Sequence, residues 1–227
     1  MIPRPENPLV VALDVSDLEA AEDLARVLEG RVGALKVGLE LFTAVGTVAV
    51  ERLRPLAPVF LDLKLHDIPN TVERAAFNVG RSGAAMVSVH ALGGEAMVAA
   101  AVRGAAAGAG HAGHPPPLVL AITVLSSLAG EGLASPASLA FEACAAGANG
   151  VVVSGEDVSV VRDVLDDEAC VVVPGIRPSG SNGHDQVRIL TPEEAMDRGA
   201  DYLVVGRPIT ASNDPAGAAR TILASVR

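Results

Sequence analysis

Cysteine is scarce in this sequence. The 227 residues include two cysteines, Cys144 and Cys170, and both lie in apolar stretches. Neither belongs to a CxxC motif or has the spacing of a metal-ligand pair. We therefore expect two buried free thiols.

Basic residues are also few. Lys and Arg total 17 against 27 Asp and Glu, which gives a formal net charge of −10 and a pI near 4.9. An acidic protein lacks the positive surface that polyanions need, so nucleic acid is not an expected partner. One focused site for a small anion remains compatible with this balance.

Long apolar runs are also missing, and we expect no secretory leader. The run Leu118–Val124 is far shorter than the roughly 20 residues that cross a bilayer, so we expect no membrane span. Residues 1–5 lead directly into a strand-like run, without the charged, apolar and small-residue segments of a signal peptide. The sequence therefore predicts a cytoplasmic protein.

Motifs for common cofactors and metals are absent too. The sequence contains no Walker A motif and no GxGxxG after its first strand-like run, so ATP and dinucleotides lack support. Its five histidines show no HxxxH spacing: His66, His90, His111, His114 and His184. We predict a reaction without metal and without organic cofactor.

Apolar strand-like runs alternate with longer Ala/Leu/Glu-rich stretches along the whole chain. Hydrophobic residues make up 50% of the sequence and charged residues 19%, which is enough for an extensive core. The expected strands are Leu9–Val15, Ala34–Val37, Val59–Leu65, Ala85–Val89, Leu118–Val124, Gly150–Val153, Cys170–Val173 and Tyr202–Val205. Eight such βα units predict an α/β fold, a TIM (β/α)8 barrel, as a single domain over residues 1–227. An open doubly wound sheet is the alternative.

Two segments between strands show contrasting patterns. Leu18–Leu28 has the apolar spacing of an amphipathic helix, with Asp17 as its N-cap. Gly104–Pro117 is rich in Gly, Ala, His and Pro, and its three prolines must end any helix. We interpret this second segment as a surface excursion at the bottom of the barrel.

Charged residues lie where the first three expected strands end. Asp14, Lys36, Asp62, Lys64 and Asp67 follow or close apolar runs, the position of catalytic residues in parallel barrels. Strand alternation directs Asp62 and Lys64 to the same face. Charges are rarely buried unpaired, so we expect an alternating network of acids and lysines at the barrel mouth. A purely structural ion-pair network is the alternative.

A second polar group follows the last two strands, where barrels commonly bind phosphate. Arg177 and Arg207 offer rigid forks of donors suited to phosphate oxygens, and Gly206 permits close backbone approach. The polar loop 179–186 has the length of a lid, from which Gln186 would reach the phosphate. Solvated surface arginines and a loop without a ligand are the alternatives.

One segment of the sequence carries a specific family resemblance. The segment Asp62–Thr71, DLKLHDIPNT, closely resembles the signature of orotidine 5′-phosphate decarboxylases. Further matches follow in family order along nearly the whole chain: Leu13-Asp14, Lys36–Gly38, Thr123–Ser127, Pro174–Pro178, Asp185-Gln186 and Val205–Ile209.

The resemblance implies conversion of orotidine 5′-monophosphate to uridine 5′-monophosphate and carbon dioxide, without a cofactor. Lys64 would protonate C6 of the pyrimidine, and Asp62 would lie against the substrate carboxylate. Lys36 would hold Asp62 and the ribose hydroxyls, and Asp14 would also bind ribose. Asp67 would enter the neighbouring subunit's site, which implies a homodimer with shared active sites.

The same resemblance assigns the remaining substrate contacts. Thr71 would help form the shared ribose and interface region, and Ser126 would contact the pyrimidine edge. The family often has threonine at this second position, and serine preserves the hydroxyl. The phosphate would be held by Gln186, Arg177, Gly206 and Arg207.

Two rival functions remain. The chain also resembles 3-keto-L-gulonate 6-phosphate decarboxylase, a Mg²⁺-dependent lyase, at Asp62, Lys64 and Asp67. The flanking Ile68–Thr71 and the region around Ser126 favour the nucleotide enzyme. The second rival is a nucleotide-binding barrel without activity, because a fold does not by itself confer catalysis.

Overall fold

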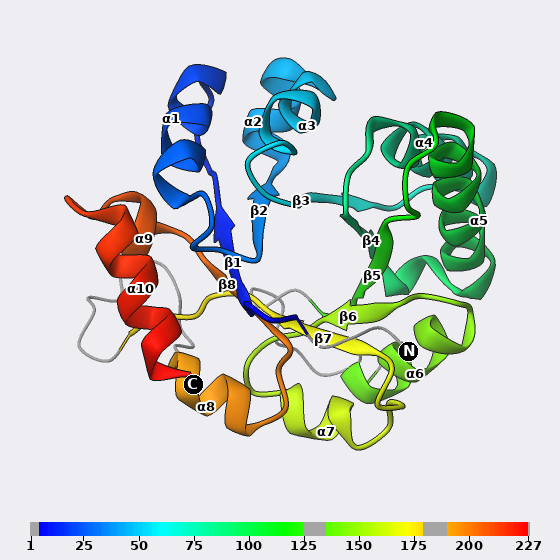
Figure 1. Ribbon diagram of the computed structural model, residues 1–227. Coiled ribbons are helices and arrows are strands. Elements are labelled where there is room, and N and C mark those ends of the chain that lie inside the picture. The colour runs from blue at the N-terminus through cyan, green and yellow to red at the C-terminus, as the bar shows by residue number, and fades with distance from the viewer. Residues whose placement is uncertain (1–4, 125–134, 179–189, 227) are drawn as a thin grey trace.

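In the computed structural model, eight parallel strands close into a barrel in chain order (Figure 1). The structure describes residues 5–124, 135–178 and 190–226. The strands are β1 Leu9–Ala12, β2 Ala34–Val37, β3 Val59–Leu65, β4 Met86–His90, β5 Leu118–Ile122, β6 Gly150–Val152, β7 Cys170–Val173 and β8 Tyr202–Val205. The predicted barrel is thereby confirmed.

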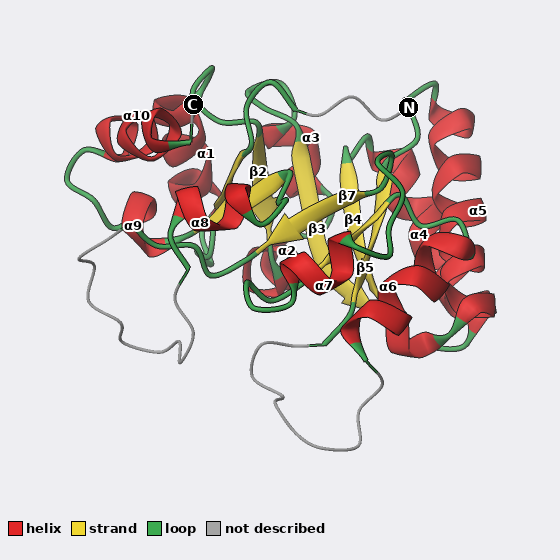
Figure 2. Ribbon diagram, turned by 90° about the horizontal axis from the view of Figure 1, so that it is seen from below, coloured by secondary structure: helices red, strands yellow, loops and turns green. Residues whose placement is uncertain are grey.

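Helices surround the strands on the outside of the barrel (Figures 1 and 2). They are α1 Leu18–Leu28, α2 Leu39–Val45, α3 Val48–Leu53, α4 Pro69–Ser82, α5 Glu95–Ala112, α6 Pro136–Ala145, α7 Val158–Arg162, α8 Pro192–Asp197, α9 Arg207–Thr210 and α10 Pro215–Ser225, with a 3₁₀ turn, η1, at Ala91–Gly93. No helix in the described ranges is long and apolar enough to cross a membrane.

Local sequence signals place most elements correctly. The predicted bounds of β2, β3, β7, β8 and α1 are those observed. The side chain of Asp17 accepts hydrogen bonds from the backbone N–H groups of Glu19 and Ala20, as expected of an N-cap. The first strand was predicted too long: β1 ends at Ala12, and Asp14 lies beyond it, exposed at the mouth. Its carboxylate pairs there with the ammonium group of Lys36.

The core has two layers. An inner layer fills the barrel and consists of Val10, Ala12, Ala34, Phe60, Met86, Leu120, Cys170, Val172, Tyr202 and Val204. An outer, larger layer packs the alternate strand residues against the helices. Strands covered on both faces are nearly continuous apolar runs, which explains the uniform strand composition.

The prediction of a surface excursion at Gly104–Pro117 is wrong. Helix α5 continues to Ala112 and ends at Gly113, which has the left-handed φ of 72°. A Cβ on Gly104 or Gly108 would collide with a backbone carbonyl of α4, so glycine allows the two helices to pack closely. This contact outweighs the low helix propensity of glycine. The three prolines lie beyond the helix, as predicted.

Both cysteines are free thiols. Cys170 is buried inside the barrel, as predicted, whereas Cys144 on α6 is only partly buried. Burial raises the pKa of Cys170 to about 12 and that of Cys144 to about 11. Both groups are therefore protonated and weakly nucleophilic at neutral pH.

Candidate active site

The carboxyl ends of neighbouring strands bring four polar side chains together. Lys36 on β2 pairs with Ala12 on β1 and with Phe60 on β3. Asp14 comes two residues after Ala12, and Asp62 comes two residues after Phe60. Because alternate residues share a face, all three polar side chains belong to the inward-facing set. Ser88 on β4 joins them through a hydrogen bond to Asp62.

The charges alternate along this group. Nζ of Lys36 donates to Oδ1 of Asp14 over 3.1 Å and lies 3.7 Å from Oδ2 of Asp62. Nζ of Lys64 donates to the same Oδ2 of Asp62 over 2.6 Å. The predicted network of Asp14, Lys36, Asp62 and Lys64 is therefore present in one chain.

The environment of Asp62 keeps its carboxylate ionised. Burial alone would raise its pKa, but the ammonium groups of Lys36 and Lys64 and the hydrogen bonds from Lys64 and Ser88 lower the pKa below its ordinary value of 3.8. The Asp62 side chain is only 15% exposed. The site thus holds a negative charge, flanked by two ammonium groups, away from bulk water.

Strand β3 is irregular at Lys64. Leu61 pairs with Val87 and Leu65 pairs with Val89, so four steps along β3 correspond to two along β4. Within this bulge Lys64 has a φ of 54°, and it is the only non-glycine residue with positive φ among those described. A left-handed lysine costs on the order of 1–2 kcal/mol, and such strain concentrates at functional sites.

Sequence reasoning missed Ser88 and the neighbouring histidines. Ser88 is fully buried and bonds to both Asp62 and Lys64. The rings of His66 and His90 lie 5.2 Å apart. Burial, together with the nearby His66 and Lys64, lowers the pKa of His90, so this imidazole is neutral at pH 7. A polar residue inside an apolar strand, such as Ser88, was the available signal.

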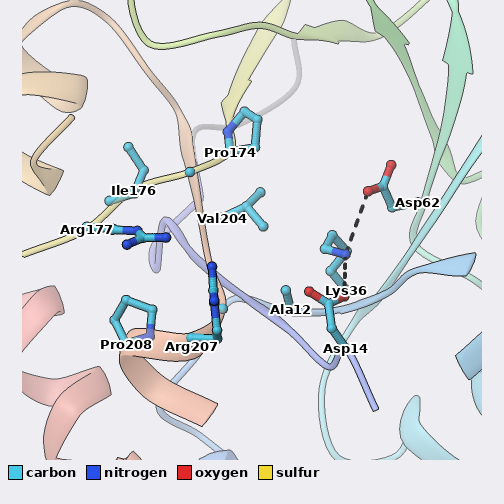
Figure 3. Close-up of a pocket in the computed structure, with 12 residues that line it drawn as sticks. Ala12, Asp14, Lys36, Asp62, Pro174, Ile176, Arg177, Val204, Arg207 and Pro208 are labelled. Atoms are coloured by element: carbon cyan, nitrogen blue, oxygen red, sulfur yellow. Dashed lines mark hydrogen bonds and ion pairs between the residues drawn. The ribbon is translucent and has the colours of Figure 1, made fainter. Parts of the chain in front are cut away.

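A cavity of about 270 Å³ adjoins the charged group. In Figure 3, Asp14, Lys36 and Asp62 lie on one side of it, and Arg177 and Arg207 lie on the other. Arg177 follows β7 and is buried, whereas Arg207 begins α9 and is exposed. The remaining lining residues are Ala12, Pro174, Gly175, Ile176, Val204, Gly206 and Pro208.

Such a cavity suits an elongated anion. The two arginines bring cationic donors to one end, and the alternating charges occupy the other. Predicted phosphate ligands Arg177, Gly206 and Arg207 thus come together, although they are far from the lysines in sequence.

Two further predicted site residues, Asp67 and Thr71, lie outside this constellation. Asp67 is exposed, and its Oδ1 accepts a hydrogen bond from the backbone N–H of Ile68. Thr71 is exposed in the first turn of α4. Ser126 and Gln186 fall outside the described residues.

Candidate metal ligands do not gather in the described ranges. No group of three or more His, Cys, Asp or Glu side chains there is arranged to hold a metal ion. The acids at the mouth are instead paired with lysines.

Comparison with known proteins identifies the family. A sequence model described as the Orotidine 5′-phosphate decarboxylase / HUMPS family matches residues 7–222. The chain belongs to this family. The resemblance found in the motifs is therefore confirmed over nearly the full length.

Individual relatives agree with this assignment. Orotidine 5′-phosphate decarboxylase of Anaeromyxobacter sp. (strain K) is 49% identical, covering 98% of this chain and all of the relative. The Moorella thermoacetica protein of the same name is 44% identical, covering 97% of this chain and 92% of that protein. The crystal structure of orotidine 5′-phosphate decarboxylase from Lactobacillus acidophilus superposes with a TM-score of 0.85 at 34% identity, covering 98% and 100% of the two chains.

Proposed function

We propose that this chain decarboxylates orotidine 5′-monophosphate to uridine 5′-monophosphate, with Lys64 as the proton donor to C6. Family membership makes it a decarboxylase of pyrimidine biosynthesis. The observation that carries the mechanism is the 2.6 Å contact of Lys64 with a partly buried, ionised Asp62 beside the cavity. That contact supports the proposal, because it holds an ammonium group beside the carboxylate that would face the reacting carbon.

The reaction needs negative charge to be stabilised at one carbon. When the bond between C6 and the carboxylate breaks, its electron pair stays on C6 and carbon dioxide leaves. This vinylic carbanion has no adjacent electron sink, so a fixed positive charge must stabilise it. The Lys64 ammonium supplies that charge and then gives its proton to C6. The resulting amine regains a proton from solvent.

Asp62 acts on the ground state. With the substrate carboxylate about 4 Å from the Asp62 carboxylate, repulsion amounts to about 4 kcal/mol at an effective dielectric constant of about 20. The repulsion disappears as carbon dioxide forms, so it favours the transition state over the bound substrate. Lys36 and Lys64 keep Asp62 ionised for this role.

Groups far from C6 supply binding energy. Arg177, Gly206 and Arg207 would hold the phosphate, and Gln186 would join them. Lys36 and Asp14 would bind ribose, and Ser126 the pyrimidine edge. Remote binding energy of this kind offsets strain and orients the reacting carbon.

A homodimer would complete the site. Asp67 and Thr71 are exposed, and among the described residues neither makes a hydrogen bond or ion pair with the charge network of its own chain. In the proposed dimer they enter the partner's site, where Asp67 extends the alternation of charges.

The test is a substrate comparison with the purified protein. Orotidine 5′-monophosphate and 3-keto-L-gulonate 6-phosphate are each incubated in excess EDTA and in excess Mg²⁺, and carbon dioxide release is measured. We expect turnover of the nucleotide alone, at equal rates with and without Mg²⁺. Turnover of the keto-sugar phosphate in Mg²⁺ would instead indicate the lyase. Binding of uridine 5′-monophosphate without turnover of either substrate would indicate a nucleotide-binding barrel.

A further inference from the structure

The buried hydroxyl of Ser88 joins the two central residues of the site. Its Oγ accepts a hydrogen bond from the backbone N–H of Lys64 over 2.9 Å. The same Oγ donates to Oδ1 of Asp62 over 2.8 Å. Ser88 is completely buried in β4, so water does not compete for these hydrogen bonds.

The first hydrogen bond compensates for the bulge. Regular pairing of β3 with β4 is interrupted between Leu61 and Leu65, and Lys64 lies inside the interruption with its left-handed φ of 54°. Its N–H therefore lacks a regular position in the strand ladder. A buried N–H without an acceptor is costly, and the Ser88 hydroxyl provides that acceptor.

The second hydrogen bond orients the carboxylate. Oδ2 of Asp62 faces the Lys64 ammonium over 2.6 Å, and Oδ1 is held by Ser88. With both oxygens engaged, rotation of the carboxylate is restricted. A hydroxyl is suited to this position because one oxygen both accepts and donates.

We propose that Ser88 is a positioning residue, which couples the strained backbone at Lys64 to the orientation of Asp62. Ser88 is fully buried and its hydroxyl is bonded to both residues, so it acts through them. The role rests on the proposed decarboxylation, because it matters only if Lys64 and Asp62 perform the chemistry. Without the hydroxyl, the Lys64 backbone relaxes and the ammonium moves relative to C6.

The proposal also predicts a change in the pKa of Asp62. Asp62 is faced by Lys36 from β2, by Lys64 from its own strand and by Ser88 from β4, with His90 at the end of β4 and His66 against it. Removing the hydroxyl removes one donor to the ionised carboxylate. The pKa of Asp62 should therefore rise in the variant, while both lysines remain in place.

The experiment compares Ser88→Ala with wild type and with Ser154→Ala. Ser154 is a buried serine that donates to the carboxylate of Asp157 over 2.7 Å, outside the charge network and the cavity lining. It therefore controls for the loss of a buried serine-to-carboxylate hydrogen bond. We expect Ser88→Ala to lower kcat about 10- to 100-fold, with a smaller change in KM, because small displacements of reacting groups are costly. Ser154→Ala should keep the wild-type kcat.

A second measurement needs no substrate. In protein labelled with ¹³C at the aspartate carboxyl carbon, the Asp62 resonance is assigned by its loss in Asp62→Asn and titrated in wild type and Ser88→Ala. A higher Asp62 pKa in Ser88→Ala supports the positioning role even if orotidine 5′-monophosphate is not turned over. The proposed reaction and the role of Ser88 can therefore fail separately.

Specific outcomes overturn the proposal. An unchanged kcat together with an unchanged Asp62 titration in Ser88→Ala would show that the hydroxyl positions nothing. Equal losses of kcat in Ser88→Ala and Ser154→Ala would indicate general destabilisation. If Ser88→Ala does not fold, Ser88→Cys, with a weaker donor of similar size, replaces it and should give a smaller effect in the same direction.

Discussion

Nζ of Lys64 and Oδ2 of Asp62 lie 2.6 Å apart, although both residues come from the same strand. Residues two apart in a regular strand share a face. Here the strand also has a bulge, and Lys64 within it has a left-handed backbone. The pair is only partly exposed, so its attraction is weakly screened. A left-handed backbone at one member of a partly buried ion pair beside a cavity is a costly arrangement of the kind that concentrates at functional sites.

Replacement of Asp62 by asparagine should destabilise the fold at neutral pH. The two flanking ammonium groups would lose their shared counterion, with a cost of about 1–3 kcal/mol. Because the pKa of folded Asp62 is below 3.8, its stabilising contribution is fully present above 3.8 and is lost as the pH falls through the folded-state value. Urea unfolding of wild type and Asp62→Asn should show a difference in unfolding free energy that narrows only below pH 3.8. An equal difference at every pH would contradict this origin.

Arg207→Ala should weaken substrate binding and slow turnover. Loss of a charged hydrogen bond to phosphate costs about 1.5–3 kcal/mol, which raises KM about 10- to 100-fold. Since binding energy from the phosphate also supports the chemistry at C6, kcat should fall as well. Steady-state kinetics provide the measurement. Arg103→Ala, which removes an exposed arginine paired with Glu73 on the helical surface, is the control and should match wild type.

Variants of Asp67 and Lys64 test whether the two subunits share each site. Asp67→Ala and Lys64→Ala should each be inactive, whereas refolding a mixture of the two should restore turnover. In the mixed dimer, one of the two sites contains native Asp67 and native Lys64. Sedimentation velocity should show dimers for each variant. A fully active monomer, or no recovery in mixtures confirmed to contain hybrid dimers, would refute the shared arrangement.

Packing between α4 and α5 provides a prediction independent of the site. Gly108→Ala would direct a methyl group at the carbonyl oxygen of Phe77, so we expect a loss of about 1–3 kcal/mol of unfolding free energy. Gly110→Ala is the matched control in the same helix, since nothing lies within 4 Å of its added Cβ. It should stabilise by about 0.5–1 kcal/mol through helix propensity. Thermal unfolding of the three proteins checks this contrast, and equal effects would contradict it.

The sequence predicts those features that depend on local pattern. Alternation within β3 was sufficient to bring Asp62 and Lys64 to one face, and the eight apolar runs were sufficient for the barrel. The bulge at Lys64 was not predictable, because it depends on how β3 pairs with β4. Ser88 escaped notice for a related reason: one hydroxyl in a strand gains meaning only from its two partners.

The glycines of α5 obscure its helical pattern in the sequence. The glycines of α5 lower helix propensity, so the segment from Gly104 onward lacked a helical pattern. Gly104 and Gly108 serve tertiary packing, since they allow contact with the α4 backbone, and no single-element pattern contains that information. Asp67 depends on still more distant structure, because its proposed role involves a second subunit.

The most direct test of the central claim is turnover of orotidine 5′-monophosphate by wild type and Lys64→Ala, both in excess EDTA. Absorbance reports loss of substrate, and calorimetry reports binding of uridine 5′-monophosphate. If Lys64 delivers the proton to C6, wild type turns over without metal, and the variant binds the product but does not react. Undiminished turnover by a folded Lys64→Ala would contradict the mechanism, and no turnover by folded wild type would contradict the function.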